Sequence, residues 1–319
     1  MGELLRAEHL KKYFKTPSGV LHAVDDISFS IDSGDTLGVV GESGCGKSTL
    51  GRVILKLIEP TDGRIIFEGR DITRVTDKEN IELRRKMQII FQDPYSSLNP
   101  RMSVMDLIAD PLKTFRLQSS ADRRKKVFEL MDMVGLSRRF ASSYPHELDG
   151  GRRQRIGVAR ALALEPTFIV CDEPVSALDV SIQAQILNLL QDLQEQQGLT
   201  YIFVTHDLSV VKHISTDILV MYTGIMVEKC EAKELFAKPM HPYTKGLLSA
   251  IPVPNIDRVR EKVALRGELT SPVEPKPECR FVARCPFATD ICRREPPTYS
   301  EVLAGHFVSC HNVREINGL

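Results

Sequence analysis

The sequence GESGCGKST, Gly41 to Thr49, is the feature that most limits what this chain can fold into. It fits the pattern G-x-x-x-x-G-K-[ST], it follows the apolar run TLGVV, and it opens the helical pattern KSTLGRVILKLIEP that Pro60 ends. A strand, a glycine-rich turn and a helix in this order direct backbone N–H groups and a helix N-terminus at one point. The motif therefore predicts a site for the phosphates of a nucleotide.

Each residue type in this motif has a chemical role in such a site. The glycines let backbone N–H groups curve around the phosphates, Lys47 would meet the β- and γ-phosphates, and Ser48 would reach Mg²⁺. A glycine-rich turn beside a surface lysine is the alternative, and the strand–turn–helix context argues against it. We expect nucleotide contacts along the whole motif, which is Gly41, Glu42, Ser43, Gly44, Cys45, Gly46, Lys47, Ser48 and Thr49.

A second stretch, FIVCDEP from Phe168 to Pro174, supplies carboxylates. Asp172 would end a buried strand and hold Mg²⁺ directly or through water, and Glu173 would act as general base on the attacking water. For this heptamer alone, two solvated acids at a strand end are a fair interpretation. Together with the glycine-rich motif, the pair predicts a metal–triphosphate site.

Two further polar residues follow predicted strands. Gln92 in IIFQDP would orient water or contact Mg²⁺, and His206 in IFVTHD would hydrogen-bond the γ-phosphate. Considered singly, each is more simply an ordinary polar residue at a strand end. Their assignment depends on the motifs around them.

Strand-like and helix-like segments alternate along most of the 319 residues. The apolar runs TLGVVGES, TFIVCDEP and TYIFVTHD alternate with helical patterns, and residues from roughly 100 to 164 are helix-rich. This alternation predicts an α/β fold with a mostly parallel sheet and helices on both faces. Prolines become frequent from about Pro239, which indicates a separate C-terminal module.

Charge and hydropathy exclude several classes of protein. The 42 Lys and Arg residues equal the 42 Asp and Glu residues, so no general attraction to nucleic acid is evident, and we expect no nucleic-acid partner. No apolar run approaches the ~18 residues of a spanning helix, and the N-terminus lacks a secretory signal. We therefore expect a soluble, cytosolic chain.

The order of these motifs resembles the nucleotide-binding subunit of an ABC transporter over residues 3 to 235. The chain has the P-loop GESGCGKST, a Q-loop glutamine, the Walker B stretch FIVCDE, a D-loop SALD and a switch histidine. The resemblance implies a P-loop NTPase core with an antiparallel β subdomain and a helical subdomain at about 94–162. It makes Glu173, His206 and Gln92 catalytic, and it places Asp179 in the D-loop.

The same resemblance implies a head-to-tail dimer that binds ATP and Mg²⁺ between its subunits. Each ATP would lie between the P-loop of one subunit and the signature of the other, with Mg²⁺ near Ser48, Gln92 and Asp172. An aromatic residue near the N-terminus usually stacks on adenine in this family. By its offset from the P-loop we favour Phe14, with Tyr13 as the alternative.

The signature segment LDGGR departs from the family pattern L-S-G-G-Q. Its residues are Leu148, Asp149, Gly150, Gly151 and Arg152, with Asp149 in place of Ser and Arg152 in place of Gln. A carboxylate facing the γ-phosphate of the other subunit's ATP would be repelled, unless a cation such as Arg152 relieves it. We expect one efficient and one poor ATP site. In one alternative, Asp149 turns outward and the glycine amides suffice. In another, the substitution, natural or engineered, traps one state of the ATPase.

A closer resemblance is to the ATPase subunits of bacterial dipeptide and oligopeptide importers, a group that includes nickel and glutathione systems. It depends on FQDPYSSLNPR, EPVSALDVSIQAQILNLL, HPYTKGLLSAIP and the terminal cysteines, and it favours the second ATPase of the usual pair. It implies a second ATPase subunit, two membrane-spanning permease subunits and an extracytoplasmic binding protein as partners, at the cytoplasmic face of the membrane. The domains would be 1–236 and 237–319. Nickel or glutathione import, or a weakly hydrolysing regulatory subunit, is the alternative.

Four of the seven cysteines lie in the last 41 residues, with the spacing C-x5-C-x6-C-x17-C: Cys279, Cys285, Cys292 and Cys310. This spacing lacks the tight pairs of structural zinc sites, and by itself it leaves zinc, an iron–sulfur cluster and unliganded thiols open. The resemblance to the importers favours a [4Fe–4S] cluster, with zinc as the alternative. A structural role comes first and redox sensing second, because a small proline-rich module needs a crosslink.

Overall fold

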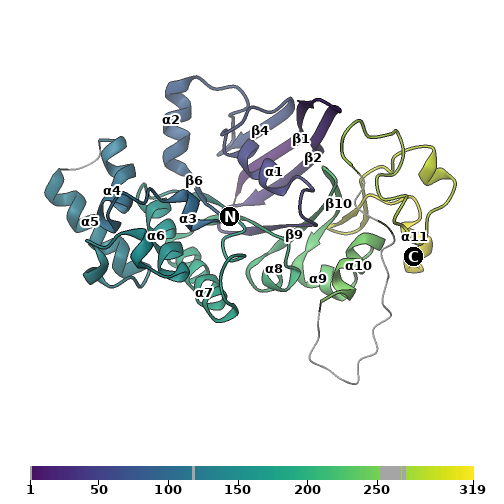
Figure 1. Ribbon diagram of the computed structural model, residues 1–319. Helices are drawn as coiled ribbons and strands as arrows, with labels where there is room; N and C mark the ends of the chain where they lie inside the picture. The colour runs from purple at the N-terminus through teal and green to yellow at the C-terminus, as the bar shows by residue number, and fades with distance from the viewer. Residues whose placement is uncertain (1, 117–118, 252–266, 268–270) are drawn as a thin grey trace. The chain divides into compact units, whose positions relative to one another are not determined.

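The polypeptide of the computed structural model, which describes residues 2–116, 119–251, 267 and 271–319, folds as two units (Figure 1). We call Val75–Ile202 the helical unit, and Gly2–Arg74 together with Phe203–Leu319 the sheet unit. Strand β8 (Thr200–Thr205) begins in the helical unit and ends in the sheet unit. None of the helices in the described ranges is long and apolar enough to cross a membrane.

An antiparallel sheet with the order β2-β1-β4-β5 begins the sheet unit. Alternating apolar residues in HAVDDISFSID bury one face of it: Ile27, Phe29 and Ile31 are buried, whereas Ser30 and Asp32 are exposed. This is the antiparallel β subdomain expected from the resemblance. Its strands are β1 (Glu3–Thr16), β2 (Gly19–Asp32), β4 (Asp62–Phe67) and β5 (Arg70–Asp71).

The other strands of the sheet unit follow the order β11-β12-β10-β9-β3. Strand β3 runs parallel to β9, and β9, β10, β12 and β11 pair antiparallel in turn. All residues of β3 are buried, as expected of a strand covered on both faces. The strands are β3 (Thr36–Val40), β9 (Asp217–Tyr222), β10 (Ile225–Glu231), β11 (Ser300–Leu303) and β12 (His306–Val308).

Short helices complete the sheet unit. The first begins directly at Lys47, where the glycine-rich turn ends. Helix α10 begins with Pro242 at its N-terminus, a position that suits proline because its missing N–H would have no helical partner. The helices are α1 (Lys47–Ile54), α8 (Leu208–Ile214), α9 (Ala232–Ala237), α10 (Pro242–Ser249), the 3₁₀ turn η3 (Ile291–Arg293) and α11 (Val313–Asn317).

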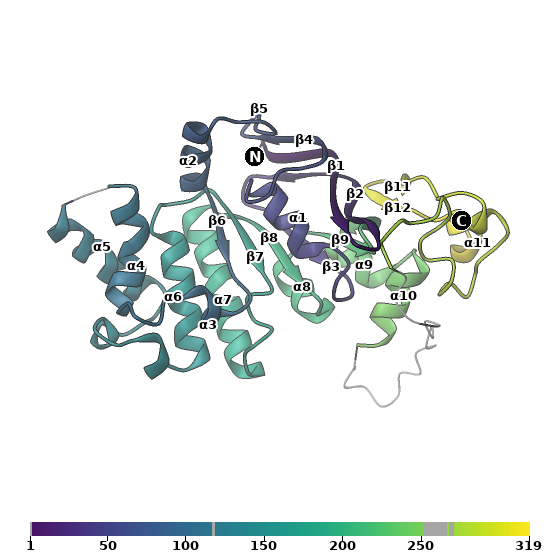
Figure 2. The ribbon, with the colours of Figure 1, turned by 45° about the horizontal axis from the view of Figure 1, so that its top comes forward.

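The helical unit is built around α6, which packs against α3, α4, α5 and α7 (Figure 2). The parallel strands β6 and β7 belong to the same unit. Ser103 and Ser119 cap α4 and α5, and Gly198 ends α7 at a φ of 66°. Its elements are α2 (Asp77–Lys86), β6 (Met87–Ile90), α3 (Pro94–Ser97), α4 (Val104–Thr114), α5 (Ser120–Met133), η1 (Arg138–Phe140), η2 (Pro145–Glu147), α6 (Gly150–Leu162), β7 (Phe168–Asp172) and α7 (Val180–Gln197).

The C-terminal segment 271–319 joins the sheet of the sheet unit through β12, which pairs with β10. Met240, Val308 and Val313 form a small apolar cluster beneath it. The buried carboxylate of Glu228 on β10 accepts a hydrogen bond from His306 Nε2 at 2.7 Å. The segment is therefore packed on the core, and the boundary at 236–237 and the subdomain at 94–162 remain predictions.

Candidate nucleotide-binding site

The glycine-rich turn between β3 and α1 has a shape that only glycine allows at two positions. A side chain at Gly41 (φ 152°) would come within 2.2 Å of the Met221 carbonyl oxygen, and one at Gly46 (φ 105°) within 2.0 Å of the Ala23 carbonyl oxygen. The loop therefore lies directly against the backbones of β9 and β2, where any side chain at these two positions would collide. The structure thus supplies the strand, loop and helix that the motif predicts.

Lys47 is held inside this loop. Its side chain is buried, and Nζ donates to the carbonyl oxygens of Gly41 at 2.8 Å and Glu42 at 3.0 Å. Ser43 and Gly44 at the tip of the loop are exposed, whereas Cys45 is buried, and burial raises the pKa of its thiol. The Lys47 ammonium group is therefore held in the loop, where it and the backbone N–H groups of the loop can bind the same anion.

The backbone N–H and the carboxylate of Glu42 are held by residues to which the sequence analysis assigned no role. Its backbone N–H donates to the Tyr243 hydroxyl at 2.9 Å. Its carboxylate accepts from both Arg284 Nη atoms, at 2.7 Å and 3.0 Å. Tyr243 belongs to the quoted stretch HPYTKGLLSAIP and Arg284 directly precedes Cys285, but no spacing rule connects either to the P-loop.

Two predicted catalytic residues of the helical unit are in contact. Gln92 Nε2 donates to Glu173 Oε2 at 2.9 Å, because each residue follows one of the parallel strands β6 and β7. Asp172 ends β7 and is buried, and Glu173 has the left-handed φ of 47°, a conformation that costs about 1 kcal/mol or more for a residue with a side chain. The chain turns directly after β7, so the neighbouring carboxylates of Asp172 and Glu173 point in different directions.

His206 follows β8 and lies in the sheet unit with the P-loop, whereas Gln92, Asp172 and Glu173 lie in the helical unit. Its side chain is exposed. The next residue, Asp207, caps α8 by accepting the Ser209 N–H at 2.8 Å, so the chain turns at His206.

The altered signature segment begins α6. Asp149 is the N-cap: Oδ1 accepts the Arg152 backbone N–H at 2.8 Å, and Oδ2 pairs with Arg152 Nη1 at 2.6 Å. Side chains at Gly150 and Gly151 would meet Leu178 at 3.0 Å and Ile182 at 2.7 Å. Both substituted residues therefore pair with each other, and the glycines have a packing role within the unit.

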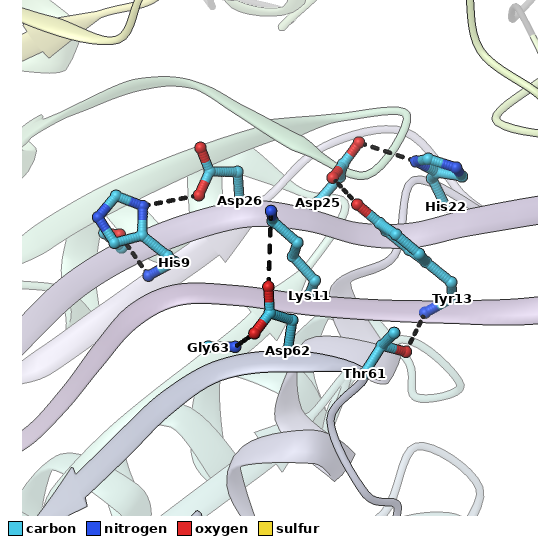
Figure 3. A network of polar contacts seen from close by, with 10 residues as sticks. His9, Lys11, Tyr13, His22, Asp25, Asp26, Thr61, Asp62 and Gly63 are labelled. Carbon is cyan, nitrogen blue, oxygen red and sulfur yellow. Dashed lines mark hydrogen bonds and ion pairs between the residues drawn. The ribbon is translucent and has the colours of Figure 1, made fainter.

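The two aromatic candidates for adenine differ in their surroundings. Tyr13 stacks on His22 with ring centroids 3.9 Å apart, and its hydroxyl donates to Asp25, which also contacts His22 (Figure 3). Asp25 forms an ion pair with Arg280 as well. Burial and the hydrogen bond to Asp25 raise the pKa of Tyr13. Phe14 has the ammonium of Lys12 5.0 Å from its ring centroid. Tyr13 is the more firmly held of the two.

The terminal cysteines lie close enough to influence one another. Burial raises the pKa of Cys279 to about 12 and of Cys310 to about 11, and nearby cysteine thiols add to both shifts. Backbone N–H groups of residues 281, 287 and 312 hydrogen-bond to Cys279, Cys285 and Cys310 and oppose these shifts. Within the described ranges, no three or more His, Cys, Asp or Glu side chains are grouped so as to hold a metal ion.

Comparison with known proteins identifies the family. Residues 24–176 match the model described as "ABC transporter", and residues 227–292 match "Oligopeptide/dipeptide transporter, C-terminal region". The putative oligopeptide transport ATP-binding protein YkfD of Bacillus subtilis is 50% identical over 315 residues, which cover 98% of this chain and 96% of YkfD. OppF of the same organism, an oligopeptide transport ATP-binding protein, is 51% identical over 310 residues, covering 97% of this chain and 96% of OppF.

The chain belongs to the ABC transporter ATP-binding proteins. Among solved structures, it is similar to the ATP-binding cassette MJ0796 in a post-hydrolysis dimer bound to ADP and Pi, with 30% identity, a TM-score of 0.66, and coverage of 72% of this chain and 99% of that one. It is also similar to CbiO1 of Clostridium perfringens, with 29% identity, a TM-score of 0.67, and coverage of 75% and 92%. The predicted family, ABC ATPase fold and ATPase activity are confirmed.

Proposed function

We propose that this ABC ATPase powers the import of di- and oligopeptides across the cytoplasmic membrane. The relatives named as oligopeptide transport proteins align with almost the whole chain, including the C-terminal region that is particular to these transporters. Because these relatives are oligopeptide transport proteins by name, we favour peptides over nickel or glutathione as the cargo.

The proposed assembly contains this chain, a second ATPase subunit and two membrane-spanning permeases, with an extracytoplasmic binding protein delivering the peptide. ABC ATPase relatives and the C-terminal region support a role beside membrane subunits. This chain would lie at the cytoplasmic face of the membrane. Closure of the ATPase dimer on ATP would then be passed to the permeases.

The contact between Gln92 and Glu173 carries the hydrolytic part of the proposal. The carboxylate would polarise the attacking water, and the amide would hold that carboxylate in place and reach Mg²⁺ on binding. Ser48 and Asp172 would supply the other Mg²⁺ contacts, Lys47 would meet the β- and γ-phosphates, and His206 would contact the γ-phosphate. The P-loop from Gly41 to Thr49 would bind the phosphates through its backbone.

The signature of this chain would serve the ATP of its partner, together with Asp179 of the D-loop. Arg152 neutralises Asp149 in the structure, which supports a signature that faces phosphate with less repulsion than a free carboxylate would cause. Both side chains remain about half exposed, so the repulsion is reduced rather than removed. We therefore propose an asymmetric pair of sites in which the site facing Asp149 is the slower.

At the adenine end we now favour Tyr13 over Phe14, because its contacts with His22 and Asp25 fix its ring. A fixed aromatic ring stacks on a base with little loss of conformational freedom. Tyr13→Ala should weaken ATP binding more than Phe14→Ala. The reverse order would return the assignment to Phe14.

For the cysteines we propose a [4Fe–4S] cluster, with zinc as the alternative. Four thiolates suffice for such a cluster, and the N–H donors beside three of the sulfurs partly offset the burial that disfavours their thiolate forms. Because each thiolate would bind a different iron, the four need not form the close group that a single ion requires. Iron, sulfide and zinc analysis after anaerobic purification tests the proposal, and a colourless, zinc-loaded protein would overturn it.

Peptide uptake by cells that lack the native gene tests the transport function. Cells expressing the parent chain should accumulate labelled di- or oligopeptide, and cells expressing Lys47→Ala should not, because the lysine is needed for productive ATP binding. Labelled nickel and glutathione serve as alternative cargoes in the same assay. Uptake of either of these in place of peptide would contradict the proposed cargo.

A further inference from the structure

Glu42, the second residue of the P-loop, is held by hydrogen bonds and an ion pair with residues that follow the ATPase core in the chain. Its N–H donates to the Tyr243 hydroxyl, its carbonyl accepts from Lys47, and its carboxylate makes a two-pronged ion pair with Arg284. The Arg284 side chain is only 8% exposed. An ion pair of this geometry fixes position and orientation together.

Tyr243 and Arg284, the residues that hold Glu42, are themselves held rigidly. Tyr243 is fully buried and meets the rings of Tyr222 and Phe281 edge-on, with centroids 4.8 and 5.6 Å away. Phe281 also packs against Tyr222, and the Arg284 guanidinium lies 5.8 Å from the centroid of the Tyr222 ring. Tyr222 ends β9, the strand that pairs with β3, which leads into the P-loop. The C-terminal segment and the P-loop thus share one aromatic support.

The contacts of Glu42 affect two features that triphosphate binding requires, which are the position of the Lys47 ammonium group and the charge of the loop. The Glu42 carbonyl is one of two oxygens that hold the Lys47 ammonium, so rotation of the Glu42 peptide would move that ammonium. The Glu42 carboxylate belongs to the loop that receives the phosphates, and without Arg284 its charge would repel them. Arg284 therefore both orients this residue and neutralises it.

We propose that Arg284 is a positioning residue for nucleotide binding, through which the C-terminal segment sets the ATP affinity of the P-loop. The inference rests on the proposed phosphate-binding role of Gly41–Thr49. The inference assigns the C-terminal segment a role at the nucleotide site of the same chain. It also predicts that the effect of Arg284 depends on the charge of Glu42.

Two variants of the full chain, Arg284→Gln alone and Arg284→Gln combined with Glu42→Gln, test this inference, with binding of Mg²⁺ and the non-hydrolysed analogue AMP-PNP measured by calorimetry. Arg284→Gln should weaken binding about tenfold, because it removes a charge-assisted pair and frees a carboxylate beside the phosphates. Glu42→Gln combined with Arg284→Gln should recover most of that loss, because the free carboxylate is gone. A structural role alone would lower the melting temperature of both variants without this recovery.

Three further variants separate the possible outcomes. Tyr243→Phe removes only the hydroxyl that accepts the Glu42 N–H, and it should weaken binding even if Arg284→Gln fails to fold. His306→Gln changes a contact of the same segment with Glu228, which does not involve Glu42, and serves as the control with unchanged affinity for the analogue. If Lys47→Ala binds as the parent does, the proposed phosphate site is wrong. If Lys47→Ala fails to bind while Arg284→Gln and Tyr243→Phe bind within about twofold of the parent, only the present inference is overturned.

Discussion

Gln92 donates a hydrogen bond to Glu173 at 2.9 Å, across the ends of two parallel strands. The amide can donate to a carboxylate but cannot take its proton, so this contact orients the Glu173 side chain. The helical unit thereby holds the carboxylate of Glu173, the proposed general base, in a defined direction.

Glu173→Gln should lower the ATPase rate at least ~100-fold while leaving ATP affinity near that of the parent, because general-base catalysis is lost and the phosphate contacts are kept. The measurement is kcat together with equilibrium ATP binding, in the assembled transporter. Gln92→Glu is an informative comparison, because it would place a second carboxylate against Glu173. Parent-like hydrolysis by Glu173→Gln would exclude this residue as the base.

Asp149→Ser should raise the ATPase rate of the site that faces this signature, since a hydroxyl replaces a carboxylate near the γ-phosphate. The cap of α6 should survive, because serine also accepts an N–H at this position. Asp149→Ala is the matched control, which removes the charge and also the cap and should cost about 1 kcal/mol of unfolding free energy. An unchanged rate per complex for Asp149→Ser would contradict the repulsion argument.

Gly46→Ala should destabilise the chain by about 3 kcal/mol or more and abolish ATP binding, because the new methyl group would overlap the Ala23 carbonyl oxygen. Gly44→Ala is the control: it also has a left-handed φ, but its added carbon meets no atom within 4 Å among the described residues. That variant should lose only about 1 kcal/mol. Chemical denaturation of both proteins provides the comparison, and equal losses would show that backbone conformation alone is responsible.

We expect the buried His241 to make the unfolding free energy of the chain fall as the pH is lowered. Burial lowers the pKa of this imidazole from its ordinary 6.5 to about 4, and the nearby Glu228 carboxylate only partly opposes that shift. The folded chain therefore keeps His241 neutral where the unfolded chain binds a proton, so the unfolding free energy should decline by about 3 kcal/mol from pH 6.5 to pH 4.

His241→Asn isolates this contribution. Asparagine can still accept the Tyr243 N–H that caps α10, but it does not titrate. The variant should show a shallower dependence of unfolding free energy on pH between 6.5 and 4 than the parent. Identical slopes for the two proteins would assign the acid sensitivity to other groups.

The parts of the site that were predicted from sequence are those that short-range rules govern. Gly46 and Lys47 follow from one nine-residue motif, and Asp149 and Arg152 are three positions apart, the spacing at which a cap reaches the helix N–H groups. Gln92 and Glu173 are far apart in the chain, but each follows a mainly apolar strand. Parallel pairing brings such positions together at one sheet edge.

The contacts of Glu42 could not be predicted in the same way. Tyr243 and Arg284 are 201 and 242 positions away, and their approach depends on how α10 and the C-terminal segment pack around Tyr222 and Phe281. Packing of this kind is a property of the whole unit, not of any local pattern. The proline-rich composition indicated a separate module there, whereas the structure shows a segment bonded to the core.

Strand β12 has a consequence for the behaviour of the protein in concentrated solution. It occupies the side of β10 that would otherwise present unpaired backbone groups, and β11 beyond it is short and carries Glu301. Open strand edges recruit strands from other molecules, and short charged ones resist this. A chain that ends before Ser300 would leave the edge of β10 uncovered. The last twenty residues of the sheet unit therefore protect the protein against aggregation through strand addition.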